Sequence, residues 1–127
     1  MELNEYFASV KGTGILSTAD DKGLVNAAVY ATPHSMEDGL IAFIMRERKT
    51  YANISINPSA CYVFIEAGKL TGTRLYLTKV KEEGDTELLF SLRRRHKASD
   101  SNTEGPLHLV YFSVDKILPL VGNGEEA

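Results

Sequence analysis

The sequence predicts a mainly β fold, an antiparallel barrel of six strands with three short helices. Short apolar segments alternate with tight turns, and most of these segments follow one another without a helix between them. A parallel sheet would need a helix after nearly every strand, whereas antiparallel neighbours can be joined by short hairpins. The length of 127 residues fits one domain, residues 1–127, and 43% hydrophobic residues can supply its core. Residues 122–127 are expected to form a disordered tail.

The individual elements follow from the spacing of apolar residues. Residues 2–11 carry apolar side chains three and four positions apart, which predicts a helix that ends at Gly12. Residues 50–56 are long enough for about two helical turns, and the Asn-Pro pair at 57–58 ends them. Residues 85–97 form a third expected helix, with leucines on its inner face. The six strands, bounded by turn residues, are expected at 14–19, 24–32, 40–45, 60–66, 75–81 and 107–114.

Three of these strands are apolar at nearly every position rather than at every second one: residues 40–45, 60–65 and 109–114. An antiparallel strand of this kind must be covered on both faces. The helices can cover part of the second face, and a second copy of the chain is the simplest cover for the rest. We therefore expect a homodimer.

Charge and composition exclude several classes of partner. The net charge of −3 makes broad attraction to nucleic acid or to an anionic membrane surface unfavourable. No apolar run approaches the roughly 20 residues that span a bilayer. The acidic N-terminus is unlike a secretory signal, and one cysteine cannot form an internal disulfide, so a cytoplasmic location is expected. No metal-ligand spacing is present, so no metal site is expected.

A basic segment precedes the second predicted helix. Arg46, Arg48 and Lys49 lie directly before Thr50, which is placed to act as the helix N-cap. A helix N-terminus offers unpaired amides and a partial positive charge, which together can receive a phosphate. Cations at this position are unfavourable for the helix itself, so the segment indicates an anionic ligand. An ordinary cap beside solvent-exposed basic residues is the other interpretation, and the spacing alone leaves both open.

Residues 49–58, KTYANISINP, resemble a K-x-x-x-N-[LI]-x-x-[ND]-P segment of the pyridoxamine 5'-phosphate oxidase-like FMN-binding split-barrel family. Residues 14–26 resemble the first hairpin of that family. The resemblance covers residues 5–117 and is strongest to the short FMN-binding proteins, which consist of little more than the barrel. It implies a six-stranded split barrel that binds FMN.

The resemblance also implies which residues would hold the phosphate end of FMN. Lys49 and Thr50 match the positions that bind the phosphate in the family. Arg46 and Arg48 would add charge there or line the ribityl chain.

Other residues would contact the isoalloxazine ring. Asn26, Ala27 and Ala28 match a stretch that lies along the ring, where small side chains leave room for a flat ligand. Ile44 and Met45 would approach the ring from the third strand.

The fifth strand would contribute from a partner. Thr73 and Arg74 match positions that often reach the flavin, commonly from the other subunit. The family is typically dimeric, with the cofactor at the subunit interface, which agrees with the doubly apolar strands.

The resulting prediction is a small FMN-dependent oxidoreductase of the pyridoxamine 5'-phosphate oxidase-related group, without an assigned catalytic residue, substrate or electron donor. The C-terminus lacks a counterpart of the substrate-binding residues of the oxidases themselves, so vitamin B6 oxidation is not expected. A non-catalytic flavin carrier or sensor, a reductase that uses the deazaflavin F420, and an empty barrel that only dimerises or binds a protein are the alternatives.

Overall fold

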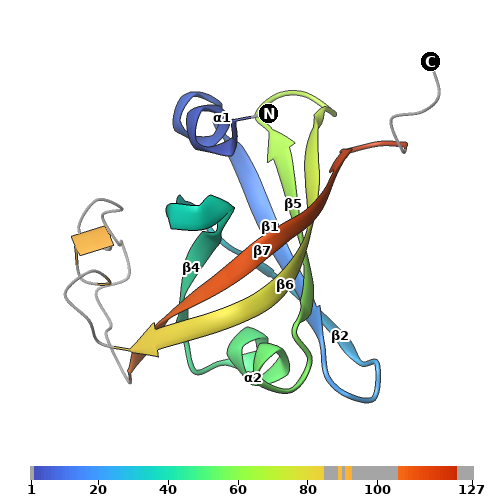
Figure 1. Cartoon of the computed structure of the whole chain (residues 1–127). Coiled ribbons are helices and arrows are strands. Elements are labelled where there is room, and N and C mark those ends of the chain that lie inside the picture. Colours follow the sequence, from blue (N-terminus) through green and yellow to red (C-terminus); the bar gives the residue numbers. More distant parts are fainter. Residues whose placement is uncertain (1, 85–88, 90, 93–105, 123–127) are drawn as a thin grey trace.

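The structure is a computed structural model that describes residues 2–84, 89, 91, 92 and 106–122. Within these residues, seven antiparallel strands form one strongly curled sheet, and helices lie at two of its ends (Figure 1). In chain order the elements are α1 (Leu3–Ser9), β1 (Gly12–Ala19), β2 (Val25–Val29), β3 (His34–Ser35), the 3₁₀ turn η1 (Glu37–Gly39), β4 (Ile41–Arg46), α2 (Lys49–Ile56), β5 (Ser59–Glu66), β6 (Gly72–Gly84) and β7 (Leu107–Pro119).

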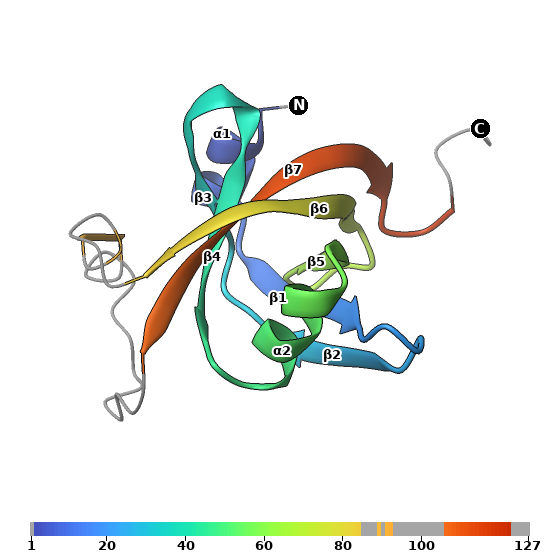
Figure 2. The same ribbon diagram turned by 60° about the horizontal axis from the view of Figure 1, so that its bottom comes forward.

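The strand order explains why the sheet curls into a barrel. The order is β2-β1-β5-β6-β7-β4-β3, so β2 and β3 lie at opposite edges although they follow each other in the chain. Residues 30–33 alone connect them, and a connection of that length spans at most about 18 Å. The two edges must therefore approach each other, and Figure 2 shows the sheet rolled around with α2 beside β1 and β2.

The mainly β, antiparallel prediction is confirmed, and the described residues form seven strands where six were expected. The additional strand is β3, which pairs His34 with Ala42 and Ser35 with Ile41. A strand of two residues shows no periodicity, so the sequence pattern could not reveal it. The β6 and β7 strands are also longer than predicted and pair as a ribbon from Thr73–Pro119 to Gly84–His108.

Two of the three expected helices are α1 and α2. The expected helix 85–97 lies largely outside the described residues, as do residues 123–127 of the expected tail. Leu89 and Leu92 are described, and both are buried. No helix among the described residues is long and apolar enough to cross a membrane.

The doubly apolar strands β4 and β7 are covered within the chain. Their inner side chains, such as Phe43 and Phe112, belong to the core inside the barrel. On the outer face, Leu89 and Leu92 form a second cluster with Leu109 and its neighbours. The outer residues of β5 differ, because they are only half-buried: Cys61, Val63 and Ile65.

Helix α2 is fastened to the barrel by polar side chains. The amide of Asn53 is buried and donates to the hydroxyl of Thr18 on β1, at 3.1 Å. The amide of Asn57, at the end of α2, donates to the carbonyl of Asp20. These bonds hold the middle and the C-terminal end of α2 against the end of β1.

Candidate functional site

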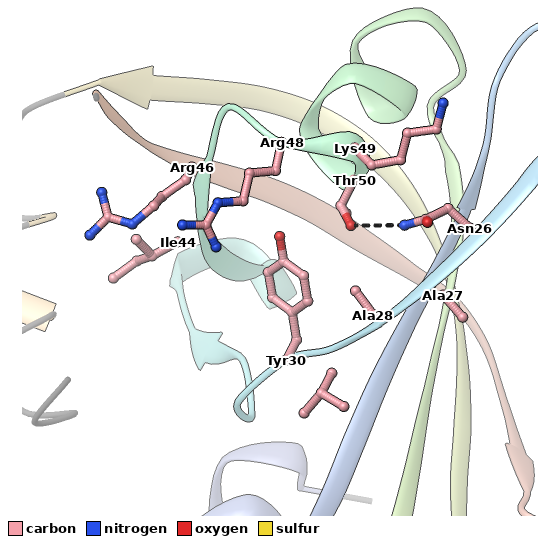
Figure 3. A pocket seen from close by; sticks show the side chains of 10 residues that line it. Asn26, Ala27, Ala28, Tyr30, Ile44, Arg46, Arg48, Lys49 and Thr50 are labelled. Carbon is pink, nitrogen blue, oxygen red and sulfur yellow. Dashed lines mark hydrogen bonds between the residues drawn. The ribbon is translucent and has the colours of Figure 1, made fainter. Parts of the chain in front are cut away.

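A pocket of about 410 Å³ opens between the start of α2, the end of β4 and the edge strand β2 (Figure 3). Its volume lies in the range of small-molecule and cofactor sites. Ten residues line it: Asn26, Ala27, Ala28, Val29, Tyr30, Ile44, Arg46, Arg48, Lys49 and Thr50. Eight of the eleven residues predicted for cofactor binding are therefore brought together at one place.

A tight turn between β4 and α2 shapes the basic side of the pocket. The Arg48 amide donates to the Arg46 carbonyl at 2.8 Å, which encloses Glu47 in a three-residue turn. Arg46 and Arg48 line the pocket, and Figure 3 shows both guanidinium groups on the same side of it. With Lys49 they make three cations, and no carboxylate is among the lining residues.

The start of α2 adds backbone donors. Helix α2 begins at Lys49, with Arg48 as the N-cap residue, and no side chain caps it. The first intrahelical bond runs from the Ala52 amide to the Arg48 carbonyl, so the amides before Ala52 have no acceptor within the helix. No acidic residue lies in the first turn. The helix dipole and the three cations therefore act together to make this end attractive to an anion.

Thr50 lies inside the helix, one residue beyond its first, so the prediction that it is the N-cap is wrong. The helix starts earlier because the turn at Glu47 already directs the chain into it. The Thr50 hydroxyl is buried and accepts a long hydrogen bond of 3.5 Å from the Asn26 amide (Figure 3). The side chain thereby connects α2 to β2 across the pocket.

Lys49 also lines the pocket, on the other side of Thr50. In Figure 3 its side chain lies across Thr50 from the two arginines. It is exposed and near the β1–β2 turn, where Asp20 accepts from the amides of Leu24 and Lys22. These two amide bonds hold the pKa of Asp20 below its usual range, and the charge of Lys49 acts in the same direction.

Tyr30 is a pocket residue that the sequence analysis did not identify. Its ring packs edge-on against Phe43, with centroids 5.8 Å apart, and its hydroxyl points toward Arg48 and Thr50 (Figure 3). Burial raises the pKa of the phenol, while the Thr50 hydroxyl and the Arg48 charge oppose that rise. Strand alternation could have revealed it, because Asn26, Ala28 and Tyr30 are spaced two apart and share one face.

The remaining wall of the pocket is formed by apolar side chains, two of them small. Ala27, Ala28 and Val29 contribute from the edge strand β2, and half-buried Ile44 contributes from β4. The small alanine side chains leave space above the strand, where a flat ring could lie.

Three predicted residues lie away from this pocket. Met45 is 1% exposed and belongs to the core, because adjacent strand residues face opposite sides and Ile44 takes the pocket side. Thr73 is buried at the start of β6. The Arg74 guanidinium donates to the carbonyls of Pro119 and Gly122. Whether Thr73 and Arg74 reach a cofactor bound by a second copy stays a prediction.

No family model matches the sequence. A search of curated proteins finds no match either.

Solved structures, in contrast, match most of the chain. An FMN-binding protein from Syntrophomonas wolfei subsp. wolfei is 21% identical, with a TM-score of 0.79 over 95% of this chain and 85% of that one. A Lactobacillus delbrueckii protein assigned provisionally as a pyridoxamine 5'-phosphate oxidase is 13% identical, with a TM-score of 0.68 over 93% and 92%. An F420 reductase is 18% identical, with a TM-score of 0.64 over 92% and 97%. The predicted split-barrel fold of the pyridoxamine 5'-phosphate oxidase-like type is confirmed.

Proposed function

We propose that this chain is an FMN-binding flavoprotein that acts as a small flavin-dependent oxidoreductase. The observation that carries the proposal is the charge of the pocket: three cations and the start of α2 converge there, without a carboxylate among the lining residues. Cations beside a helix N-terminus are unfavourable for the helix itself, whose dipole favours an anion there. A phosphate monoester is an anion of suitable size and charge.

The pocket also suits the rest of FMN. Arg46 and Arg48 lie where they can add charge-assisted hydrogen bonds to the phosphate or contact the ribityl chain. Ala27, Ala28 and Ile44 offer an apolar wall for the isoalloxazine ring. The basic part of the pocket thus suits the phosphate and ribityl chain of FMN, and the apolar part suits its isoalloxazine ring.

When bound, the flavin would supply the electron or hydride transfer. The chain would hold the phosphate, cover one face of the ring and exclude part of the solvent from it. The phenol of Tyr30 is neutral at physiological pH, and burial raises its pKa further, so it can donate a hydrogen bond toward a ligand.

We also propose that the chain is a homodimer with the cofactor at the subunit interface. The outer face of the sheet supports this. Paired residues of four neighbouring strands form one row across this face: Val29 on β2, Ile15 on β1, Val63 on β5 and Arg74 on β6. Val25 and Val29 are 82% and 74% exposed. A second copy packed on this apolar row would cover it and would bring its own Arg74 toward the β2 edge of the pocket.

Absorbance spectra of the purified full-length protein test the cofactor. Addition of FMN is expected to give a shifted, protein-bound flavin spectrum, with FMN bound more tightly than riboflavin, which lacks the phosphate. Tighter binding of F420 than of FMN would favour the deazaflavin alternative. A protein that binds neither would contradict the proposal.

Turnover and assembly are tested separately. Oxidation of NADH or NADPH by the FMN-loaded protein is the expected result, whereas bound FMN without turnover of any donor would indicate a carrier or sensor. Light scattering is expected to report twice the 14.0 kDa mass of one chain, and a monodisperse single-chain species would contradict the dimer.

A further inference from the structure

Arg74 stands at one end of an apolar row on the outer face of the sheet. The other three members of the row are Val63, Ile15 and Val29, in that order from β6 towards β2. Directly paired residues of an antiparallel sheet project from the same face, so these four side chains are neighbours. The row therefore has a cation at its β6 end and the exposed Val29 at its β2 end.

The hydrogen bonds of Arg74 fix the direction of its side chain without compensating its charge. Its Nε donates to the carbonyl of Pro119 at 2.8 Å, and its Nη2 donates to the carbonyl of Gly122. The segment that offers these carbonyls is itself held, because the Leu120 amide donates to the Gly72 carbonyl at 3.1 Å. Both acceptors are neutral backbone groups, so the guanidinium keeps its charge and further N–H groups for an anion.

A second copy that packs on this face can be related to the first by a two-fold axis in either of two directions. An axis along the row would place the two copies of Arg74 opposite each other, which is unfavourable because like charges repel. An axis along the strands reverses the row, so that Arg74 of each copy faces Val29 of the other. Neighbouring strands lie about 4.8 Å apart, so Arg74 and Val29 are both about 7 Å from the point midway between Ile15 and Val63. The charge of Arg74 thus favours the second arrangement.

Val29 connects this face to the candidate site, because it is one of the residues that line the pocket. Arg48 and Lys49 line the same pocket, and both are exposed. The second arrangement would therefore bring Arg74 of one copy towards two cations of the other. Without an anion in the pocket this approach is unfavourable, whereas a bound phosphate makes it favourable.

We propose that the ligand and the second copy bind cooperatively, because the phosphate in the pocket of one subunit attracts Arg74 of the other. The inference rests on the proposed function, since it takes the ligand to carry a phosphate and the chain to dimerise through this face. Thermodynamic linkage makes the effect reciprocal: the dimer binds the ligand more tightly than the single chain does, by the factor that applies at each site. The dimer contains two such sites, so its dissociation constant changes by the square of that factor.

The experiment measures the dimer dissociation constant of the full-length protein by analytical ultracentrifugation at neutral pH. The three conditions are no ligand, saturating FMN and saturating riboflavin, which lacks the phosphate. FMN is expected to lower the dissociation constant about tenfold, because a partly exposed charge pair contributes about threefold at each site. Riboflavin is expected to change it less than about twofold. High salt screens exposed charges and is expected to reduce the FMN effect.

Substitutions of Arg74 test whether the coupling acts through this residue. Arg74→Met removes the charge and keeps a long apolar side chain. It is expected to dimerise without ligand at least as tightly as the wild type, and to respond to FMN no more than to riboflavin. Arg74→Lys keeps the charge and is expected to retain part of the FMN effect. Lys69→Met makes the same change of net charge in the turn between β5 and β6, and is expected to respond to FMN as the wild type does.

Three results would overturn the inference. A wild-type dimer that forms equally well with and without FMN would show that the two binding events are not coupled. An equal effect of riboflavin would mean that the ring, rather than the phosphate, strengthens the dimer. An FMN effect that persists in Arg74→Met would assign the coupling to another group. A wild type that binds no FMN, or that stays a single chain in every condition, would contradict the proposed function itself, and the wild-type measurements alone reveal that result.

Discussion

A short helix lies at each of the two ends of the barrel, and the side chains that surround the two helices differ in polarity. Helix α1 lies at one end and α2 at the other (Figure 1). Each helix carries a tyrosine whose hydroxyl donates to a glutamate on the sheet at 2.6 Å: Tyr6 to Glu66 at the α1 end, and Tyr51 to Glu82 at the α2 end. The same hydrogen bond therefore occurs in two different surroundings.

At the α1 end the surroundings are apolar and close-packed. Phe7 of α1 contacts the rings of Tyr62 and Phe64 edge-on, with centroids 6.1 and 5.2 Å apart. The backbone approaches so closely that a Cβ on Gly12 would lie 2.2 Å from the Ile65 carbonyl oxygen. This end stabilises the fold through packing.

At the α2 end the surroundings are polar and charged. The pocket beside α2 is lined by three cations, and the helix start has no side-chain cap. A helix start without a side-chain cap weakens the fold slightly and strengthens the binding of an anion. Under the proposed function, the α1 end stabilises the fold and the α2 end binds a ligand, so substitutions at the two ends should have separate effects.

The largest effect is expected from Gly12→Ala at the α1 end. The new Cβ meets backbone atoms that no side-chain rotation can relieve, so the free energy of unfolding is expected to fall by about 3 kcal/mol. Urea denaturation measures it. Gly84→Ala is the matched control, because its Cβ would meet nothing closer than 3.8 Å. Equal stability of both variants would contradict the close approach at Gly12.

At the α2 end, Lys49→Ala is expected to weaken FMN binding by about 1.5–3 kcal/mol, the contribution of a charged hydrogen bond. The free energy of unfolding without ligand is expected to change by less than about 0.5 kcal/mol, since Lys49 is exposed. Isothermal titration calorimetry measures the first and urea denaturation the second. Lys11→Ala removes an exposed lysine elsewhere and serves as the control. Equal FMN affinity in Lys49→Ala and wild type would remove the phosphate assignment.

Tyr30→Phe should have a smaller effect on the same ligand. It removes only the hydroxyl that points toward Arg48 and Thr50, so we expect FMN affinity to fall by about 0.5–1.5 kcal/mol. The ring and its contact with Phe43 are retained, which keeps the fold unchanged. Calorimetry with FMN checks the prediction, and an unchanged affinity would show that the hydroxyl does not contact the cofactor.

The smallest effect concerns the two tyrosine–glutamate bonds. Burial, with the nearby Glu66 carboxylate, raises the pKa of Tyr6 to about 12, and the hydrogen bond to Glu82, with burial, raises that of Tyr51 to about 12. A raised pKa means stability that is fully present below pH 10 and lost as the pH rises through 12.

Each Tyr→Phe variant is therefore expected to lose about 0.5–1 kcal/mol of unfolding free energy at pH 8, since both bonds are partly exposed. Each should also lose stability less steeply than wild type between pH 10 and 12. Urea denaturation at a series of pH values measures both. An identical alkaline slope in all three proteins would contradict the raised pKa values.

Much of this fold could be predicted from local patterns. The helices α1 and α2 carry strong local signals and lie where the spacing indicated, although α1 ends at Ser9 and Gly12 already begins β1. The strand β3 could not be predicted, nor could the parts of β6 and β7 that extend beyond the predicted ranges, residues 72–74, 82–84 and 115–119. Their pairing depends on partners far along the chain rather than on their own apolar pattern.

The residues of the candidate site likewise fall into two groups: those that the local sequence revealed and those that depend on the tertiary structure. The basic segment before α2 was visible because its residues are adjacent in the sequence. Tyr30 was not identified: its spacing from Asn26 and Ala28 places it on their face of the strand, but only the approach of β2 to α2 makes that face a wall of the pocket. Met45 was predicted to face the ring, but whether it or Ile44 faces the pocket depends on how β4 is turned within the barrel.

By itself the sequence determined the class of fold, the positions of two helices and the concentration of cations before the second one. These properties depend on residues close together in the chain, whose spacing and charge act whatever the distant parts do. Only the tertiary structure decided which edge strands meet and which side chains line the pocket. Those depend on the closure of the sheet, which brings residues from β2, β4, α2 and β7 together, and no local pattern encodes the distance between them.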